Sequence, residues 1–316
     1  MIKYIQHENI DTEKWDRCIN KSYNGMVYGY SWYLDVVCKE WDALVEDDYY
    51  RVFPLTKRKK AGIDYLFQPL FTQQLGVFSQ GKLTEEITNH FLEAIPEKYR
   101  LIEINLNSFN KPVPNKDNSN NFIENQNYEL DLIRPYEEIK KSYSKNLQRN
   151  LKKAEKEGIT FMKSIRPEDV ISVFRNNRGK YIRKLNNEAY RMLKHLIYVL
   201  IYRGRGQVWG AYDSRNNMVA GAVFVKSANK WIFLFSGTSA EAREMGAMPY
   251  LIDRFIFHHS NTNSTFDFEG SNDPNLARFY SSFGAERCSY YHYNKNELPW
   301  MIKNSVKLVK KIRNRL

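Results

Sequence analysis

Cysteine is scarce in this sequence of 316 residues, which contains only Cys18, Cys38 and Cys288. The three lie far apart, are odd in number and form no CxxC pair, so they provide neither a disulfide framework nor a cysteine-based zinc site. This usage fits a reducing compartment. We interpret all three as structural thiols rather than as reactive or metal-binding groups.

Long apolar runs are also missing. The longest such stretch, around residues 193–202, contains Lys194 and His195 and is too short to span a bilayer. Residues 1–10 carry charged side chains and lack the apolar core of a signal peptide. We therefore expect a soluble cytoplasmic protein, which leaves room for peripheral contact with the inner face of the membrane.

Several catalytic and binding motifs are absent as well. The sequence contains no Walker-type phosphate loop, no dinucleotide fingerprint and no Ser-His-Asp pattern. His258 and His259 are adjacent near the end of a predicted helix, but no nearby cysteine or carboxylate completes a set of metal ligands. We expect no metal and interpret the two histidines as partners of the helix dipole.

Positive charge, by contrast, is abundant. The chain has 48 Lys and Arg against 36 Asp and Glu, a net charge of +12 at pH 7. This excess suits coenzyme A phosphates, tRNA or acidic lipid head groups, and equally a chain that is basic for solubility. Basic residues concentrate in a predicted helix over 135–158 and in the segment Trp300–Leu316. The latter could lie on an anionic membrane, or pack its apolar face on the protein.

The order of predicted elements indicates an α/β protein with a mixed sheet. Its length and 42% hydrophobic content allow two domains, each with its own core. The Asn- and Pro-rich segment 107–127 is interpreted as a long loop at the domain change. This gives an N-terminal lobe of residues 1–127 and a C-terminal lobe of residues 128–316. The second lobe is predicted to follow the order β-α-α-β-β-β-α-β-α-β.

Two stretches of the second lobe carry a family resemblance. The run Arg243-Glu244-Met245-Gly246-Ala247 resembles the Arg/Gln-x-x-Gly-x-Gly/Ala turn of GNAT acyltransferases, although Met248 departs from its last position. The run Phe266-Asp267-Phe268-Glu269-Gly270, with Phe279-Tyr280-Ser281-Ser282-Phe283-Gly284 after it, resembles the Fem-type, tandem-GNAT group that includes formers of peptidoglycan bridges. The resemblance covers residues 128–293 and implies two tandem GNAT-like lobes.

The resemblance also implies a site for an acyl-CoA donor. In GNAT enzymes the turn binds the coenzyme A pyrophosphate through backbone N–H groups, and its glycine permits a close approach. The corresponding candidates here are Arg243, Met245, Gly246 and Ala247. An ordinary glycine-containing helix start is the structural alternative.

Catalytic candidates follow from the second stretch. Tyr280 stands where GNAT enzymes often place a tyrosine that protonates the coenzyme A thiolate, and where Fem-type enzymes commonly have lysine. Glu269, at the end of a predicted strand, is the expected base, and strand alternation puts Asp267 on the same face as a substrate-binding carboxylate. A packed aromatic ring and a solvated or ion-paired carboxylate are the structural alternatives. In the first lobe, Gln68 and Gln73 are expected to line the acceptor cleft.

These interpretations predict an acyltransferase that moves an acyl group from an acyl-CoA thioester to an amine or hydroxyl acceptor. The second lobe would hold the donor, and the first lobe, which shows no pyrophosphate turn, would shape the acceptor site. One alternative is a Fem-type transferase that uses aminoacyl-tRNA to modify a cell-wall precursor. Another is a non-enzymatic binding protein on the same scaffold.

Overall fold

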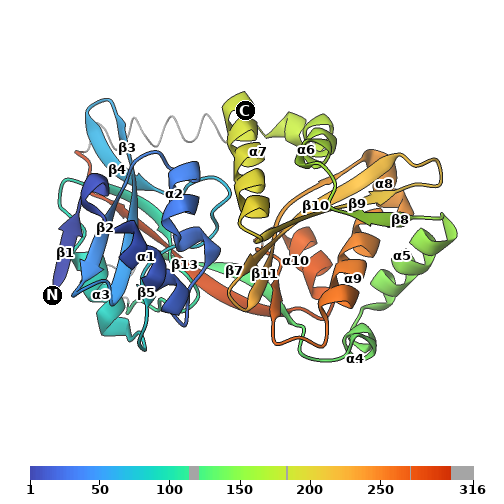
Figure 1. Cartoon of the computed structure of the whole chain (residues 1–316), viewed down its shortest axis with the longest axis horizontal. Coiled ribbons are helices and arrows are strands. Elements are labelled where there is room, and N and C mark those ends of the chain that lie inside the picture. The colour runs from blue at the N-terminus through green and yellow to red at the C-terminus, as the bar shows by residue number, and fades with distance from the viewer. Residues whose placement is uncertain (114–120, 183, 271, 300–316) are drawn as a thin grey trace. The chain divides into compact units, whose positions relative to one another are not determined.

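The structure, a computed structural model, describes residues 1–113, 121–182, 184–270 and 272–299 (Figure 1). Its contacts divide the chain into two units. Unit 1 comprises Met1–Glu124 and the described residues from Tyr290 onward, and unit 2 comprises Asn125–Ser289. The domain boundary predicted from the sequence, after residue 127, lies close to this division, but the prediction assigned the residues after Tyr290 to the second lobe. The basic segment Trp300–Leu316 lies outside the described residues.

Unit 1 contains a mixed sheet with the strand order β1-β2-β3-β4-β6-β13. Neighbouring strands are antiparallel except β4 and β6, which pair in parallel. The short strand β5 (Phe78–Ser79) pairs with β3. The strands are β1 (Ile2–Ile5), β2 (Trp41–Glu46), β3 (Arg51–Lys60), β4 (Ile63–Phe67), β6 (Leu101–Asn105) and β13 (Glu286–Asn296). The helices are α1 (Thr12–Lys21), α2 (Ser31–Val37) and α3 (Glu85–Glu93).

Unit 2 contains a second sheet with the order β8-β9-β10-β11-β12-β7. Again all neighbours are antiparallel except the fourth and fifth strands, β11 and β12. The strands are β7 (Phe122–Asp131), β8 (Thr160–Lys163), β9 (Gly206–Tyr212), β10 (Met218–Ser227), β11 (Lys230–Thr238) and β12 (Thr265–Asp267). The helices are α4 (Tyr136–Lys141), α5 (Lys145–Lys156), α6 (Pro167–Asn176), α7 (Asn187–Tyr202), α8 (Ala240–Met245), α9 (Ala247–His259) and α10 (Pro274–Ser281).

The two units repeat one architecture. In each, two helices separate the first and second strands, and helical chain separates the parallel fourth and fifth strands. The two units exchange their sixth strands along the sequence. β13, the last strand of the described residues, pairs with β6 in unit 1, whereas the earlier β7 pairs with β12 in unit 2. This repetition confirms the predicted α/β class with two tandem GNAT-like lobes.

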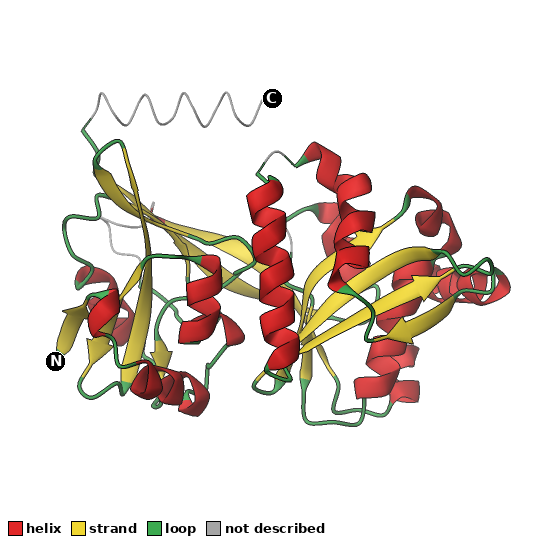
Figure 2. Ribbon diagram, turned by 45° about the horizontal axis from the view of Figure 1, so that its top comes forward, coloured by secondary structure: helices red, strands yellow, loops and turns green. Residues whose placement is uncertain are grey.

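Helices cover both faces of the unit 2 sheet (Figure 2). On one face, the rings of Phe224 in β10 and Phe255 in α9 stack with centroids 3.7 Å apart. On the other face, a Cβ added to Gly237 of β11 would come within 2.7 Å of the Val170 carbonyl oxygen in α6. Glycine therefore allows α6 to lie directly on the strand, and this contact positions the segment that follows α6.

Several predicted elements need correction. The single helix expected over 135–158 is two helices, because Ser144 caps α5 by accepting a hydrogen bond from the Leu147 N–H at 3.2 Å. The loop expected over 107–127 gives way to β7 from Phe122 onward. Among the described residues, no helix is long and apolar enough to cross a membrane.

Candidate active site at the carboxyl ends of β11 and β12

The parallel strands of unit 2 separate soon after they meet. Their pairing runs from Lys230 opposite Thr265 to Ile232 opposite Asp267, and β11 then continues alone on that side to Thr238. In open α/β sheets, ligands bind beyond the carboxyl ends of the strands. The segments that follow β11 and β12 are therefore the place to look for reactive side chains.

A buried pair of polar side chains holds the turn after β12. The N–H of Glu269 donates to Asp267 Oδ1 at 2.8 Å, and the N–H of Gly270 donates to Asn127 Oδ1 at 2.6 Å. Asn127 Nδ2 also donates to Asp267 Oδ1 at 3.0 Å, which joins the two anchors. Glu269 takes a left-handed conformation with φ of 52°. The predicted common face of Asp267 and Glu269 is therefore wrong, because β12 ends at Asp267 and the alternation stops there.

One oxygen of the Glu269 carboxyl group is buried without a polar partner in the described part of the chain. The residue as a whole is partly buried, and its Oε1 is out of contact with solvent and has no hydrogen-bond partner among the described residues. Burial raises the pKa of Glu269 to about 8. A carboxyl group with such a pKa exchanges a proton near neutral pH, as a general base must.

Tyr280 of α10 lies beside this carboxyl group. Its ring packs on Phe268, with centroids 5.0 Å apart, and the residue is 8% exposed. Burial and then the charge of Glu269 raise the pKa of Tyr280 to about 12, while the positive charge of Arg178 opposes the rise. Glu269, Tyr280 and Arg178 are thus close enough to act on one another electrostatically.

Asp267, predicted to bind substrate, is instead 1% exposed and faces the interior. Burial raises its pKa to about 6, against the opposing charge of Lys230. Lys230 Nζ lies 2.5 Å from Glu129 Oε1 on β7, so one cation serves two carboxylates. In this position Asp267 anchors the backbone of Glu269, and its predicted contact with substrate stays a prediction.

A cationic cavity of about 630 Å³ opens at the carboxyl end of β11. Arg178 and Lys180, in the 3-10 segment Arg178–Tyr181 after α6, line it together with Arg243 of α8. All three are exposed. Arg178 also affects the pKa of Tyr280, so cavity and proton-transfer pair belong to one neighbourhood. Sequence reasoning found Arg243 but missed Arg178, whose only signal was its place in the basic run Arg178-Gly179-Lys180.

The other predicted donor residues lie at the junction of α8 and α9. Gly246 has φ of 71°, and its N–H donates to the Ala242 carbonyl oxygen. A Cβ at this position would come within 2.5 Å of the Asn150 carbonyl oxygen in α5. Gly246 and Ala247 are buried, and Met245 packs against the core. The glycine therefore serves a close approach to α5, and a contact with pyrophosphate stays a prediction.

In unit 1, the side chains of Gln68 and Gln73 form hydrogen bonds within their loop and to the neighbouring strand β6. Gln68 Oε1 accepts a hydrogen bond from the Asn105 N–H at 2.8 Å, and Gln68 Nε2 donates to the Thr72 carbonyl oxygen at 2.7 Å. Gln73 Oε1 accepts from Gln74 Nε2 at 2.8 Å. These bonds give both residues a structural role, and their predicted contact with an acceptor stays a prediction.

Known proteins resemble this chain in structure rather than in sequence. Neither a family model nor a curated protein matches it. FemX superposes with a TM-score of 0.61 and 13% identity over 92% of this chain and 97% of its own. The C-terminal domain (DUF2156) of a candidate lysylphosphatidylglycerol synthetase from Agrobacterium fabrum superposes with a TM-score of 0.55 and 10% identity, over 91% of this chain and 92% of its own. A Bacteroides thetaiotaomicron protein of unknown function superposes with a TM-score of 0.55 and 10% identity, over 94% of this chain and 100% of its own. The chain thus has a GNAT/Fem-like fold.

Proposed function

We propose that this chain is an acyltransferase that moves an acyl group from an acyl-CoA thioester to an amine or hydroxyl acceptor. The observation that carries the proposal is the pairing of Glu269 and Tyr280 beside the cationic cavity. Glu269 has a pKa of about 8 and Tyr280 a pKa of about 12, so as the pH rises to about 8 Glu269 ionises to a base while Tyr280 keeps its proton and can act as an acid. Transferases with the same fold, such as FemX, support the class.

The reaction divides between these residues. The acceptor nitrogen or oxygen attacks the thioester carbonyl carbon, and the carboxylate of Glu269 takes the proton that the acceptor loses. The carbon–sulfur bond then breaks, and the thiolate takes the proton of the Tyr280 hydroxyl. The positive charge of Arg178 stabilises the phenolate left behind, which regains a proton from solvent, while the carboxyl group of Glu269 gives up its proton to solvent. Both groups thus return to their starting states.

The cavity supplies the means of holding the donor. Arg178, Lys180 and Arg243 present three cations to a volume of about 630 Å³, and coenzyme A carries its negative charge on phosphates. The pairing of β11 with β12 ends at Ile232, and β11 continues to Thr238, which lines the cavity. Both features lie at the same end of the sheet.

A second candidate function is favoured by helix α5. Five cations on it are exposed, and none forms an ion pair within the described ranges of the chain. They are Lys145, Arg149, Lys152, Lys153 and Lys156. This surface suits a polyanion, and FemX shares the fold, so an aminoacyl-tRNA donor with a cell-wall precursor as acceptor is the alternative. A non-enzymatic binding protein is the third possibility.

The first test is isothermal titration of the full chain with acetyl-CoA and with longer acyl-CoA esters. Micromolar binding is expected, weakened at least tenfold by Arg178→Ala or Arg243→Ala. Arg215→Ala, in the exposed turn between β9 and β10, is the matched control. A bulky residue at Gly246 is a poor probe, because its left-handed φ and the contact with Asn150 predict misfolding.

Failure to bind any thioester would overturn the proposed donor. Charged tRNA is then the next ligand, and its affinity should fall steeply with salt and with Arg149→Glu on α5. If neither donor binds, the non-enzymatic interpretation is favoured.

A further inference from the structure

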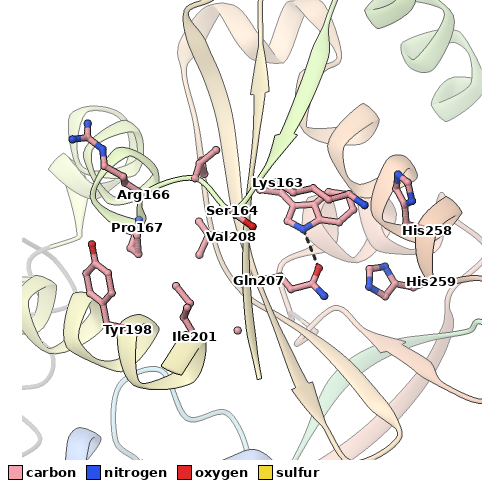
Figure 3. Close-up of a pocket in the computed structure, with 13 residues that line it drawn as sticks. Lys163, Ser164, Arg166, Pro167, Tyr198, Ile201, Gln207, Val208, His258 and His259 are labelled. Carbon is pink, nitrogen blue, oxygen red and sulfur yellow. Dashed lines mark hydrogen bonds between the residues drawn. The ribbon is translucent and has the colours of Figure 1, made fainter. Parts of the chain in front are cut away.

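Unit 2 has a second cavity of about 630 Å³ at the other end of its sheet (Figure 3). It lies where β8 ends, β9 and α6 begin, and α7 and α9 end. β9 and β11 both run antiparallel to β10, so the start of β9 lies at the end of the sheet where β11 begins. Glu269 and the cationic cavity lie at the carboxyl end of β11 and β12. The second cavity is therefore a separate site.

One side of this cavity gathers a cation and two imidazoles. Lys163 Nζ lies 4.7 Å from the centroid of the Trp209 ring and forms no ion pair within the described part of the chain. His259 Nδ1 lies 2.8 Å from the Phe255 carbonyl oxygen, which can only accept, so Nδ1 carries the proton. His258 is exposed at the mouth of the cavity. Figure 3 shows both imidazoles on the same side as Lys163.

The charges that face these imidazoles are positive. Burial lowers the pKa of His258, and Lys163 and Arg254 lower it further. Burial also lowers the pKa of His259 to about 4, with further lowering by Lys163, His258 and Lys226. No carboxylate contributes to either shift. Two carboxylates lie next to other lining residues: Asp169 pairs with Arg166 at 2.9 Å, and Glu168 accepts from the Tyr198 hydroxyl at 2.8 Å. An anion beside Lys163 would therefore meet positive charge there and would favour protonation of His258.

Exposed apolar side chains lie at and near the cavity. They are Tyr198 (45% exposed) and Ile201 (39%) of α7, Tyr202 (91%) at the end of that helix, and Phe257 (46%), whose ring contacts His258 on α9. Tyr198 and Ile201 also line the cavity itself. Protein surfaces that enter a lipid interface typically combine aromatic and aliphatic side chains with lysine and arginine. This rim favours a lipid over a phosphate compound free in solution.

We propose that this cavity binds the phosphate of an anionic phospholipid head group at a membrane surface. Lys163 and His258 hold the phosphate oxygens, and the rim of Tyr202, Ile201 and Phe257 enters the interface. The attraction of one lysine to an anionic bilayer is sufficient to change affinity about fivefold. This site does not depend on the reaction proposed above. It is also distinct from the basic segment Trp300–Leu316, on which membrane contact was expected from the sequence.

Sedimentation of the full chain with vesicles tests the proposal. Vesicles of phosphatidylglycerol are expected to bind it, and vesicles of phosphatidylcholine are not. Lys163→Gln should weaken binding about fivefold. Lys156→Gln removes the same charge from α5 and should weaken it less. Tyr202→Ser, at a position 91% exposed, tests the rim with little risk to folding. The segment Trp300–Leu316 is common to every variant, so its contribution cancels.

Two further readouts distinguish the head-group site from general charge attraction. Affinity should rise as the pH falls from about 7.5 to about 5.5, because the bound phosphate favours protonated His258, and His258→Gln should remove most of this dependence. Proton NMR of His258 should show its pKa rising when glycerol phosphate is added. Equal losses in Lys163→Gln and Lys156→Gln, or equal binding to both vesicles, would overturn the proposal. Glycerol phosphate that binds as tightly as the vesicles would refute the membrane assignment.

Discussion

Replacing Glu269 by glutamine should favour the folded protein, relative to the parent, increasingly as the pH rises. Burial raises the pKa of Glu269 from 4.5 to about 8, so the native state keeps a proton that the unfolded chain has lost. The contribution of this group to stability is therefore fully present below about pH 4.5 and is lost as the pH rises to about 8. At about 1.4 kcal/mol per pH unit, the whole change is roughly 5 kcal/mol, which is an upper limit if water enters the native site.

Glutamine does not titrate, so its stability relative to glutamate should rise by up to about 1.4 kcal/mol for each pH unit between about pH 5 and 8. The unsatisfied amide adds a cost of about 1–3 kcal/mol, but that cost is the same at every pH. The measurement is urea unfolding of both proteins at about pH 5, 6, 7 and 8. Glu244→Gln, at an exposed position of α8, is the control and should show no trend. A constant difference between Glu269→Gln and the parent would refute the burial of this carboxyl group.

Three further predictions concern the same region. Gly270→Ala should destabilise unit 2 by several kcal/mol, since its Cβ would lie 2.2 Å from the Asn127 Cα; circular dichroism during thermal unfolding measures this. Lys230→Met should cost about 3–5 kcal/mol near neutral pH, because it leaves buried carboxylates without their cation. That cost should shrink in acid, as the carboxyl group of Asp267, whose pKa is about 6, takes up a proton; chemical unfolding across this range detects the change. Acyl transfer, if the chain performs it, should accelerate as the pH rises to about 8 and Glu269 ionises, in a plot of kcat/KM against pH.

The fold could be predicted because its signals are local. Asp11 caps α1 by accepting from the Lys14 N–H at 3.0 Å, and Trp15 and Cys18 then fall on the buried face at helical spacing. The alternation of Phe266 with Asp267 likewise marks a strand with one apolar face. Patterns of this kind repeat through both units and predict most of the elements, whereas the strands β1 and β5, the division of 135–158 into α4 and α5, and the helix α8 were missed.

The cationic cavity could not be predicted in the same way. Arg178 lies on a short 3-10 segment with no hydrophobic period, and its nearness to Tyr280 depends on the packing of α6 against Gly237. Nothing local in the sequence relates residues so far apart. Arg243 was found only because it stands in a recognisable motif, although the expected open turn is helix α8 followed by a buried glycine.

The two carboxylates of the Phe-Asp-Phe-Glu-Gly run show how a partner distant in sequence decides chemistry. Asn127 lies on β7, in a stretch that the sequence alone assigned to a loop, and it bonds to Asp267 across 140 positions. With that bond in place, Asp267 is an internal anchor and the chain turns left-handed at Glu269. Asp267 is the more buried of the two, but its hydrogen bonds and the charge of Lys230 hold its pKa at about 6, whereas the pKa of Glu269, whose Oε1 has no such partner among the described residues, rises to about 8. The pairing of β7 with β12, which brings Asn127 beside Asp267, therefore contributes to the difference between them.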